Sequence, residues 1–432
     1  MAGSERPRNV MPTRSPTARY FRGAIGLLAP VALLAIVALM LEGRSGPAPQ
    51  AQSRPIGPHH SISPELPKAV HPKPAAAPPA AIRKGPLRTA NVCGLGPITV
   101  KSDNPDLAIA VSTEVDRRVA KAARAWIATL RDSDDLVVRA AGLLLDGHTV
   151  GDRTVTSMSA TSGNALVQLA AGADSAAYAL AFEMCDTYRT TGEYPAMKAE
   201  CDQLSAARWA QIDPGNAVPW LIRARDALAA GDASTEADAI AHAAQANQVN
   251  AYGDRLMASL RPLIPTTLPV AERVALESDV GSYFDTWWNI PYGTVLNYCD
   301  QSLSADRKPV CAQIGALLMA GGWTTMDVMV GLRVGERAGW SSTRIQEATA
   351  QRNALFPDTP RARIAPWSCQ GLQMTDQIVD AEISGGDRAG AQRARQLWHL
   401  PDTSISAKSI ALVEGALDWS EKDPLPMRIV RQ

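Results

Sequence analysis

The sequence predicts an all-α fold, an irregular domain of helical hairpins behind one transmembrane helix. Three observations lead to this prediction. Beyond about residue 103, apolar residues recur at helical spacing with little strict alternation, which is typical of amphipathic helices. Alanine is abundant and aromatic residues make up only 5% of the chain, a composition that favours closely packed helices. Near the N-terminus, a long uncharged apolar run predicts a membrane span.

The predicted transmembrane signal-anchor covers residues 23–41, which carry no charge and are nearly all apolar. A helix of this length crosses a hydrocarbon core of about 30 Å. Five arginines precede it, opposed only by Glu5, so the positive-inside rule places residues 1–22 in the cytoplasm and the rest of the chain on the far side. A cleaved signal peptide is the alternative, and it would put the domain on the same side.

Residues 43–89 are rich in Pro and Ala and poor in large apolar side chains. Such a stretch buries too little surface to offset its ordering entropy, so the sequence predicts a disordered linker that acts as a semi-stiff spacer. Beyond it we expect a helical domain over 93–262 and a C-terminal helical region over 269–420.

Charge and motifs exclude several classes of function. Lys plus Arg equals Asp plus Glu at 43 each, which argues against a nucleic-acid partner, since that requires a basic face. No metalloprotease, hydrolase or phosphate-loop motif occurs, so we assign no catalytic residue, no metal ligand and no cofactor. The domain's histidines, His148, His242 and His399, each lie apart from other His and Cys, and a surface or core role is expected.

Several helices can be placed from periodicity and end signals. Ser341 is expected to cap the helix that follows it, and a turn over 192–195 separates two of the others. The predicted helices cover 103–132, 165–184, 196–212, 269–288, 294–299, 309–320, 324–338, 341–355, 373–383 and 388–397.

One stretch carries a recognisable motif. Residues 213–220 read Asp-Pro-Gly-Asn-Ala-Val-Pro-Trp, and a Gly-Asp pair follows at 231 and 232. This stretch resembles the tetratricopeptide repeat (TPR), in which a helix ends at an Asp-Pro-x-Asn-Ala turn and the next helix opens with a Trp. The similarity covers about 165–247, with one clear repeat, and it implies a TPR-like helical hairpin. Asp213 is expected to cap the helix that begins near Ala217, and Gly231 to relieve the inter-helix turn.

Together with the anchor, the linker and the paired cysteines, this motif is similar to a family of uncharacterised bacterial membrane-anchored proteins. That resemblance implies the bacterial inner membrane, a single pass and a periplasmic C-terminal domain. It brings no activity with it.

All six cysteines follow the linker, and an even number on the oxidising side of a membrane indicates disulfides. Two pairs are close in sequence, Cys185 with Cys201 and Cys299 with Cys311, which leaves Cys93 and Cys369. Six cysteines allow 15 connectivities, so this pairing is a hypothesis. A catalytic role for Cys369 with His399 as its base is the less favoured alternative.

A dense aromatic cluster, which forms either core or a groove for a glycan or peptide, is the best candidate for a binding site. Its members are Tyr283, Phe284, Trp287, Trp288 and Tyr292. Three pairs of carboxylates could act together on a glycan: Glu183 with Asp186, Asp376 with Asp380, and Glu272 with Glu277. Such spacing is also common on solvated helix faces.

Two hypotheses about function follow. The favoured one is a scaffold or accessory factor whose helical hairpins bind a protein partner in the cell envelope, because stacked hairpins of this kind form binding surfaces. The alternative is an enzyme acting on cell-wall glycan or peptide. An aromatic groove holding two acidic side chains with shifted pKa values would favour the enzyme.

Overall fold

The computed structural model describes residues 86–101, 107–146, 148, 159–172, 174–191, 197–285, 290–300, 303–358, 367–401, 404–407 and 409–411. The described part is mostly helical, as predicted. The predicted cytoplasmic segment, the membrane span and nearly all of the linker lie outside these residues. None of the helices described is both long and apolar enough to cross a membrane.

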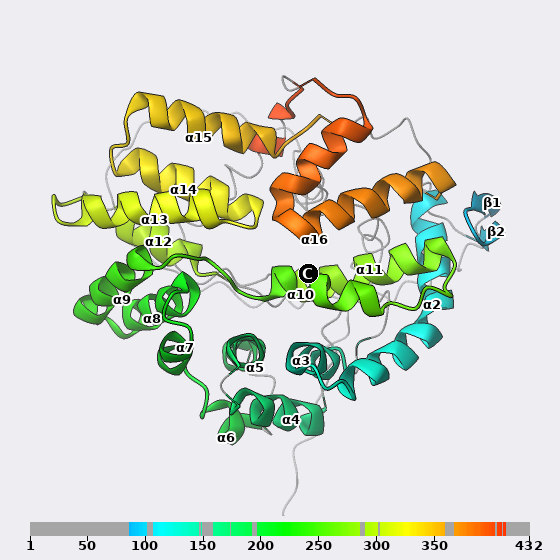
Figure 1. Ribbon diagram of the computed structural model, residues 1–432, viewed down its shortest axis with the longest axis horizontal. Helices are drawn as coiled ribbons and strands as arrows, with labels where there is room; N and C mark the ends of the chain where they lie inside the picture. Colours follow the sequence, from blue (N-terminus) through cyan, green and yellow to red (C-terminus); the bar gives the residue numbers. More distant parts are fainter. Residues whose placement is uncertain are drawn as a thin grey trace, which may run out of the picture.

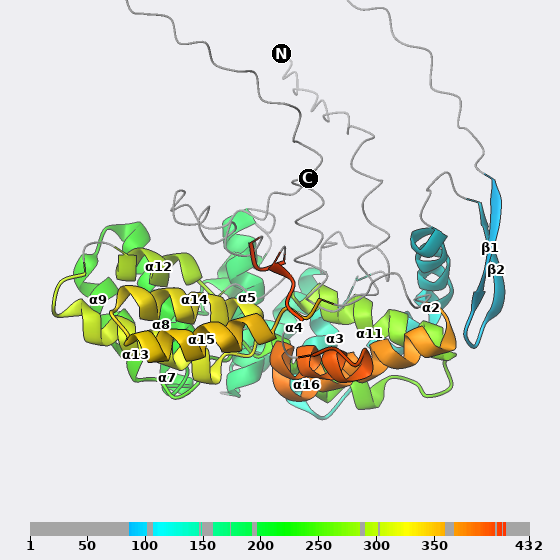
Figure 2. The same cartoon turned by 90° about the horizontal axis from the view of Figure 1, so that it is seen from above.

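The helices form a flattened, disc-like layer (Figures 1 and 2). The chain runs from α2 along one edge of the disc to α9, crosses the middle through α10 and α11, and returns along the opposite edge to α16. The helices are α2 (Leu107–Arg131), α3 (Leu136–Leu144), α4 (Ala160–Ala170), α5 (Ser175–Thr191), α6 (Lys198–Cys201), α7 (Ala206–Ile212), α8 (Ala217–Ala230), α9 (Ala233–Gln245), α10 (Gly253–Leu260), the 3-10 turn η4 (Arg261–Leu263), α11 (Val270–Asp285), α12 (Tyr292–Asp300), α13 (Arg307–Gly321), α14 (Thr325–Arg337), α15 (Ser342–Ala354) and α16 (Cys369–Leu397).

A β-hairpin precedes the helices. Its strands, β1 (Leu87–Val92) and β2 (Gly96–Lys101), pair antiparallel, and Gly94 takes a positive φ of 79° in the connecting turn. The linker prediction was therefore wrong at its end, since residues 87–89 belong to β1. The strands were missed because each is only six residues long, and their apolar face is completed by residues of α2 and α11.

The hairpin of helices expected after residue 216 is present as α8 and α9. Gly231 has φ 72° at the end of α8, as the turn requires. The cap of α8 is Asn216, whose side chain accepts a hydrogen bond from the Val218 N–H. The prediction that Asp213 caps this helix was wrong, because Asp213 instead accepts hydrogen bonds from Asn216 Nδ2 and the Tyr252 hydroxyl.

Two predicted helices are divided. The stretch predicted as a helix over 165–184 contains the end of α4 and the start of α5, where the Asp174 carboxylate accepts from the Ala177 N–H. The stretch over 196–212 contains the short α6 and α7, and Ser205 caps α7. The sequence patterns also missed α3, which Asp135 caps. The Ser341 cap of α15 is confirmed.

The main core crosses the boundary that the sequence suggested between two helical regions. One cluster of buried apolar residues extends from Val119 in α2 to Ile410 near the C-terminus. A second, smaller cluster joins the β-hairpin, the first half of α2, α11 and Trp367. The regions 93–262 and 269–420 therefore share a core.

Helices from both regions pack in one continuous series. In this series α7 packs on α8, α8 on α9, α9 on α13, α13 on α14, and α14 on α15. We call these six helices the helical stack. Helix α12 packs against α8, α13 and α14, so the chain itself covers part of one side of the stack.

Candidate binding cleft and polar clusters

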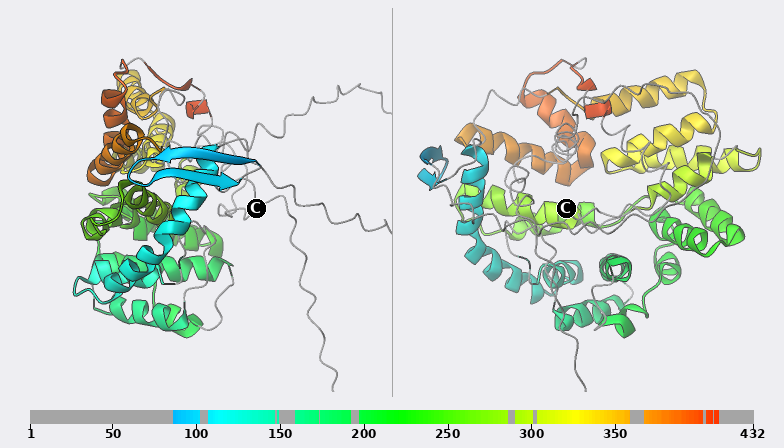
Figure 3. Two further views of the ribbon diagram at one scale, coloured as in Figure 1. Left: turned by 90° about the vertical axis from the view of Figure 1, so that its right-hand side faces the viewer. Right: turned by 180° about the vertical axis from the view of Figure 1, so that it is seen from behind.

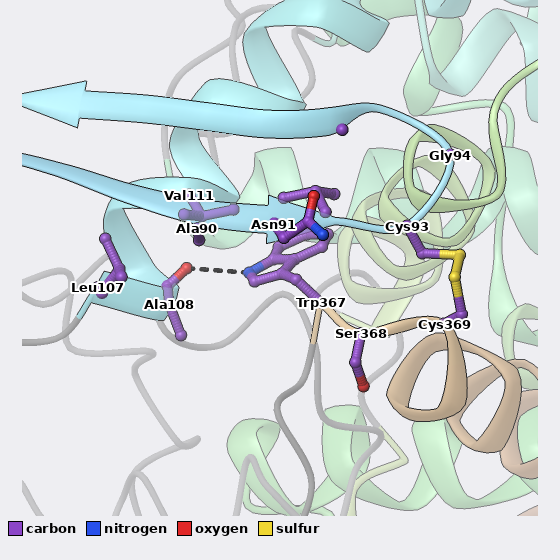
Figure 4. Close-up of a pocket in the computed structure, with 12 residues that line it drawn as sticks. Ala90, Asn91, Cys93, Gly94, Leu107, Ala108, Val111, Trp367, Ser368 and Cys369 are labelled. Carbon is purple, nitrogen blue, oxygen red and sulfur yellow. Dashed lines mark hydrogen bonds between the residues drawn. A yellow bond between two sulfur atoms is a disulfide. The ribbon is translucent and has the colours of Figure 1, made fainter.

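A cleft of about 760 Å³ opens between β1, the first turns of α2 and the start of α16 (Figure 4). Its lining is largely apolar, and none of the lining residues carries a charge. Ala90 and Val92 come from β1 and Leu107 and Val111 from α2, while Trp367 lies two residues before α16.

Trp367 joins the walls of the cleft. Its indole Nε1–H donates to the Ala108 carbonyl oxygen at 3.2 Å, and its own carbonyl oxygen accepts from the Cys93 N–H at 3.0 Å. The side chain is 4% exposed. Figure 4 shows the indole directly beside β1, between the strand and α2.

A disulfide closes one end of the cleft. Cys93 and Cys369 are bonded, which ties the end of β1 to the first residue of α16. Cys369 is exposed and Cys93 is half-buried. The structure also bonds Cys185 to Cys201 and Cys299 to Cys311, so it contains the three pairs inferred from the sequence. The alternative role of Cys369 as a nucleophile is ruled out by its disulfide.

The aromatic cluster does not form an open groove in the described residues. Tyr283, Phe284 and Tyr292 are at most 9% exposed and belong to the main core. The Tyr283 hydroxyl donates to the Leu144 carbonyl oxygen at 2.9 Å. Of the two alternatives, these three side chains therefore form core and not a groove, because helix packing encloses them. Trp287 and Trp288 lie outside the described residues.

The first predicted carboxylate pair, Glu183 and Asp186, lies on α5 facing α8. Asp186 accepts two hydrogen bonds from the Arg225 guanidinium, at 2.8 and 3.0 Å. Glu183 is only 2% exposed. Burial raises the pKa of Glu183 well above its usual value, the nearby Asp186 charge raises it further, and Arg225 opposes both. The pair is therefore enclosed between helices and does not face the cleft.

The two other predicted pairs lie near arginines. Asp376 and Asp380 on α16 both bind the Arg261 guanidinium, Asp376 at 2.7 Å. Glu277 lies 3.5 Å from the same guanidinium, and burial is the main cause that raises its pKa. Glu272, five residues earlier on α11, is half-buried. This arrangement is an ion-pair network that joins α11 to α16.

Two polar clusters were not predicted. In one, His148 Nε2 lies 2.6 Å from Asp279 Oδ2, and both side chains are buried. The centroid of the His148 ring lies 4.3 Å from that of Tyr283, with the two rings tilted by 40°. His148 and Asp279 are 131 positions apart, so no local motif could reveal their contact.

The other cluster places two buried carboxylates at the start of α14. Asp327 accepts from the Tyr292 hydroxyl at 2.8 Å and from the Thr324 N–H at 2.9 Å. Asp387 of α16 accepts from the Thr325 N–H at 2.6 Å. Burial is the main cause that raises the pKa of each, and the Asp327 charge raises that of Asp387 further. These carboxylates cap a helix in a closed interior.

On the α8–α9 hairpin, an aromatic group lies partly at the surface. The Trp220 and His242 rings stack at 4.3 Å with an interplanar angle of 15°. The Arg223 guanidinium lies 4.8 Å from the centroid of the Trp220 ring. The His242 side chain is 45% exposed, while Trp220 and Arg223 are half-buried. We call Trp220, Arg223 and His242 the hairpin surface group.

Within the described residues, no group of three or more His, Cys, Asp or Glu side chains is arranged to hold a metal ion. Comparison with known proteins adds no relative: no family model matches the chain, and no curated protein or solved structure matches it.

Proposed function

We propose that this chain is a membrane-tethered scaffold of the cell envelope that binds a protein partner through its helical stack. The hairpin surface group carries this proposal. Trp and Arg are the residue types most often responsible for affinity at protein interfaces, and here both lie on the hairpin that resembles a TPR motif. The stacked rings and the guanidinium hold one another in place, which lowers the entropy lost when a partner binds.

The location outside the cytoplasm has separate support. All six cysteines of the chain are in disulfides, a pattern typical of oxidising compartments. The uncharged segment 23–41 and the arginines before it then supply the anchor. The proposed topology is a single pass through the bacterial inner membrane, with the helical domain in the periplasm.

An enzyme acting on cell-wall glycan or peptide is the alternative. Catalysis by paired carboxylates requires that both face a substrate across an open site. Asp186, Asp376 and Asp380 bind arginines, and Glu183, Asp327 and Asp387 are buried between helices. These six carboxylates therefore favour the binding function.

Crosslinking in intact cells, followed by purification of the tagged full-length protein, tests the scaffold. Arg223→Glu reverses the charge in the hairpin surface group, and Arg124→Glu makes the same change on the exposed face of α2, as the matched control. We expect wild type and R124E to capture one stoichiometric envelope protein. Recovery with R223E should fall about tenfold, the effect of removing a contact worth about 1.4 kcal/mol.

A shortened protein that lacks residues 1–44 and is exported by another signal shows whether capture needs the tether. Absence of a specific partner with all four proteins would overturn the scaffold proposal. Equal capture by R223E and R124E would instead remove the hairpin surface group from the interface.

A further inference from the structure

We propose that the outer edge of β1 and the cleft beside it bind an extended, acidic and apolar segment of a partner protein as an added β-strand. This inference rests on the proposed function, since it specifies the chemistry of the partner. The β-hairpin lies at the rim of the molecule, beside α2 (Figures 1 and 3).

The direction of the backbone groups shows which residues form the free edge. The Val92 carbonyl accepts from the Leu95 N–H within the turn, so the Val92 polar groups face β2. In a β-strand these groups alternate in direction, so those of Leu87, Thr89 and Asn91 point away from β2. The next residue in this series, Cys93, already bonds outward to Trp367.

The two edges of the hairpin differ in protection. Proteins block exposed edges with proline and lysine, because an unpaired edge pairs with other strands. By the same alternation, the outer edge of β2 includes Pro97, which has no N–H group, and Lys101. On β1 the outward residues are Leu87, Thr89 and Asn91, which include neither type. Leu87 is also 73% exposed, so a strand added at this edge would cover apolar surface.

The cleft supplies pockets for alternate side chains of an added strand. Its lining is apolar, with Leu107 and Val111 on one side and Trp367 next to β1. Lys101 is exposed opposite Leu87 in the register, and residues 86–101 contain no acidic residue, which favours acidic side chains on the segment that binds. Strand addition uses this combination, in which the main chain provides affinity and the pockets provide specificity.

The edge is also held in position before binding. The Cys93–Cys369 disulfide and the Cys93–Trp367 hydrogen bond attach the end of β1 to α16. A fixed edge loses little conformational entropy when a strand is added, so a short segment is enough for measurable binding.

The test uses full-length protein in lipid nanodiscs and a fluorescent seven-residue peptide in which Glu and Val alternate. A second peptide has the same sequence, with its N–H groups on one edge replaced by N-methyl groups. Fluorescence polarisation gives both affinities. We expect the N-methyl peptide to bind at least about tenfold more weakly, because it cannot donate to the edge of β1.

Two proline variants locate the edge. Thr89→Pro removes an outward N–H from β1, and Thr99→Pro removes one from the outer edge of β2. Both changes also remove the same hydroxyl contact between Thr89 and Thr99, 2.8 Å long, which makes them matched. We expect T89P to lower the affinity at least about tenfold and T99P to change it less than about twofold.

Equal effects of T89P and T99P, equal binding of the two peptides, or no binding at about 1 mM peptide would each overturn this proposal. If circular dichroism shows that T89P is misfolded, the proposal is judged by the affinities of the two peptides for the wild-type protein. Capture of the envelope partner by T89P at the wild-type level, together with failure of the peptide to bind, would reject the β1 site and leave the scaffold standing. A loss of partner capture that occurs only with R223E tests the hairpin surface group of the proposed scaffold, and it does not test the edge of β1.

Discussion

Glu183 is a single residue whose burial has a measurable thermodynamic consequence. It lies between α5 and α8, and one of its carboxylate oxygens has no hydrogen-bond partner. Its pKa in the folded protein is raised above the ordinary value of 4.5, mainly by burial. The folded state therefore binds this proton more tightly than the unfolded chain does, and the stability that Glu183 contributes at low pH is lost as the pH rises above about 4.5.

From this we predict that Glu183→Gln stabilises the protein at pH 7.5 by about 1–2 kcal/mol. The amide avoids the cost of either burying a charge next to Asp186 or holding a proton that the unfolded chain releases. Urea unfolding of wild type and variant at pH 7.5 and pH 4.5 measures the effect. The gain should shrink at the lower pH, where Glu183 is protonated in the folded state. Glu347→Gln, on the exposed face of α15, should change little at either pH. A lower free energy of unfolding for E183Q than for wild type at pH 7.5 would contradict the predicted stabilisation.

Other single residues show what a sequence pattern reveals. The Ser341 cap and Gly231 could be identified because their partners lie within a few positions along the chain. Asp213 was assigned as a cap by the same reasoning and was wrong, because Asn216 is closer to the helix and also bonds Asn250, 34 positions away. Contacts such as His148 with Asp279 depend on the tertiary fold alone.

At the scale of elements, the junction between α16 and α14 depends on one glycine. Gly386 interrupts α16 with φ 70° and ψ −172°, a region open almost only to glycine. A Cβ at this position would overlap the Trp323 carbonyl oxygen. The interruption lets the Asp387 N–H donate to that oxygen at 3.0 Å and lets the Asp387 carboxylate cap α14.

We therefore predict that Gly386→Ala destabilises the protein by at least about 3 kcal/mol, since backbone strain adds to the loss of this cap. Gly339→Ala is the matched control. Gly339 also has a positive φ, 84°, but nothing lies within 4 Å of its added Cβ, so about 1 kcal/mol is expected. Denaturant unfolding of both variants tests the difference. Equal losses of unfolding free energy in the two variants would show that the close approach to Trp323 adds nothing to the destabilisation by Gly386→Ala.

The same elements show why helix boundaries were predicted unevenly. Helices α13, α14 and α15 begin and end close to the expected positions because glycine and capping residues mark their ends. The break between α4 and α5 was missed although Gly172 and Asp174 lie in it, because alanines continue the apolar pattern through it. The strands were missed because burial of Ile98 and Val100 depends on α2 and α11, which only the folded structure brings to them.

At the scale of the whole molecule, one covalent bond joins the first described element to the last long helix. The Cys93–Cys369 disulfide spans 276 positions, whereas the other two disulfides span 16 and 12. It also differs in access, because Cys369 is exposed and the four other cysteines are at most 4% exposed. A reductant therefore reaches this disulfide first, while the main core encloses the remaining two.

We predict that mild reduction of the native protein, followed by alkylation and peptide mass spectrometry, labels Cys93 and Cys369 before any other cysteine. The helical circular dichroism signal should persist, because the main core does not depend on this bond. Cys93→Ser combined with Cys369→Ser should lower the free energy of unfolding by about 2–4 kcal/mol, since the unfolded chain regains the freedom of a long loop. Simultaneous labelling of all six cysteines would contradict this order, because it would mean that the main core, which encloses the other four cysteines, opens together with the end of β1.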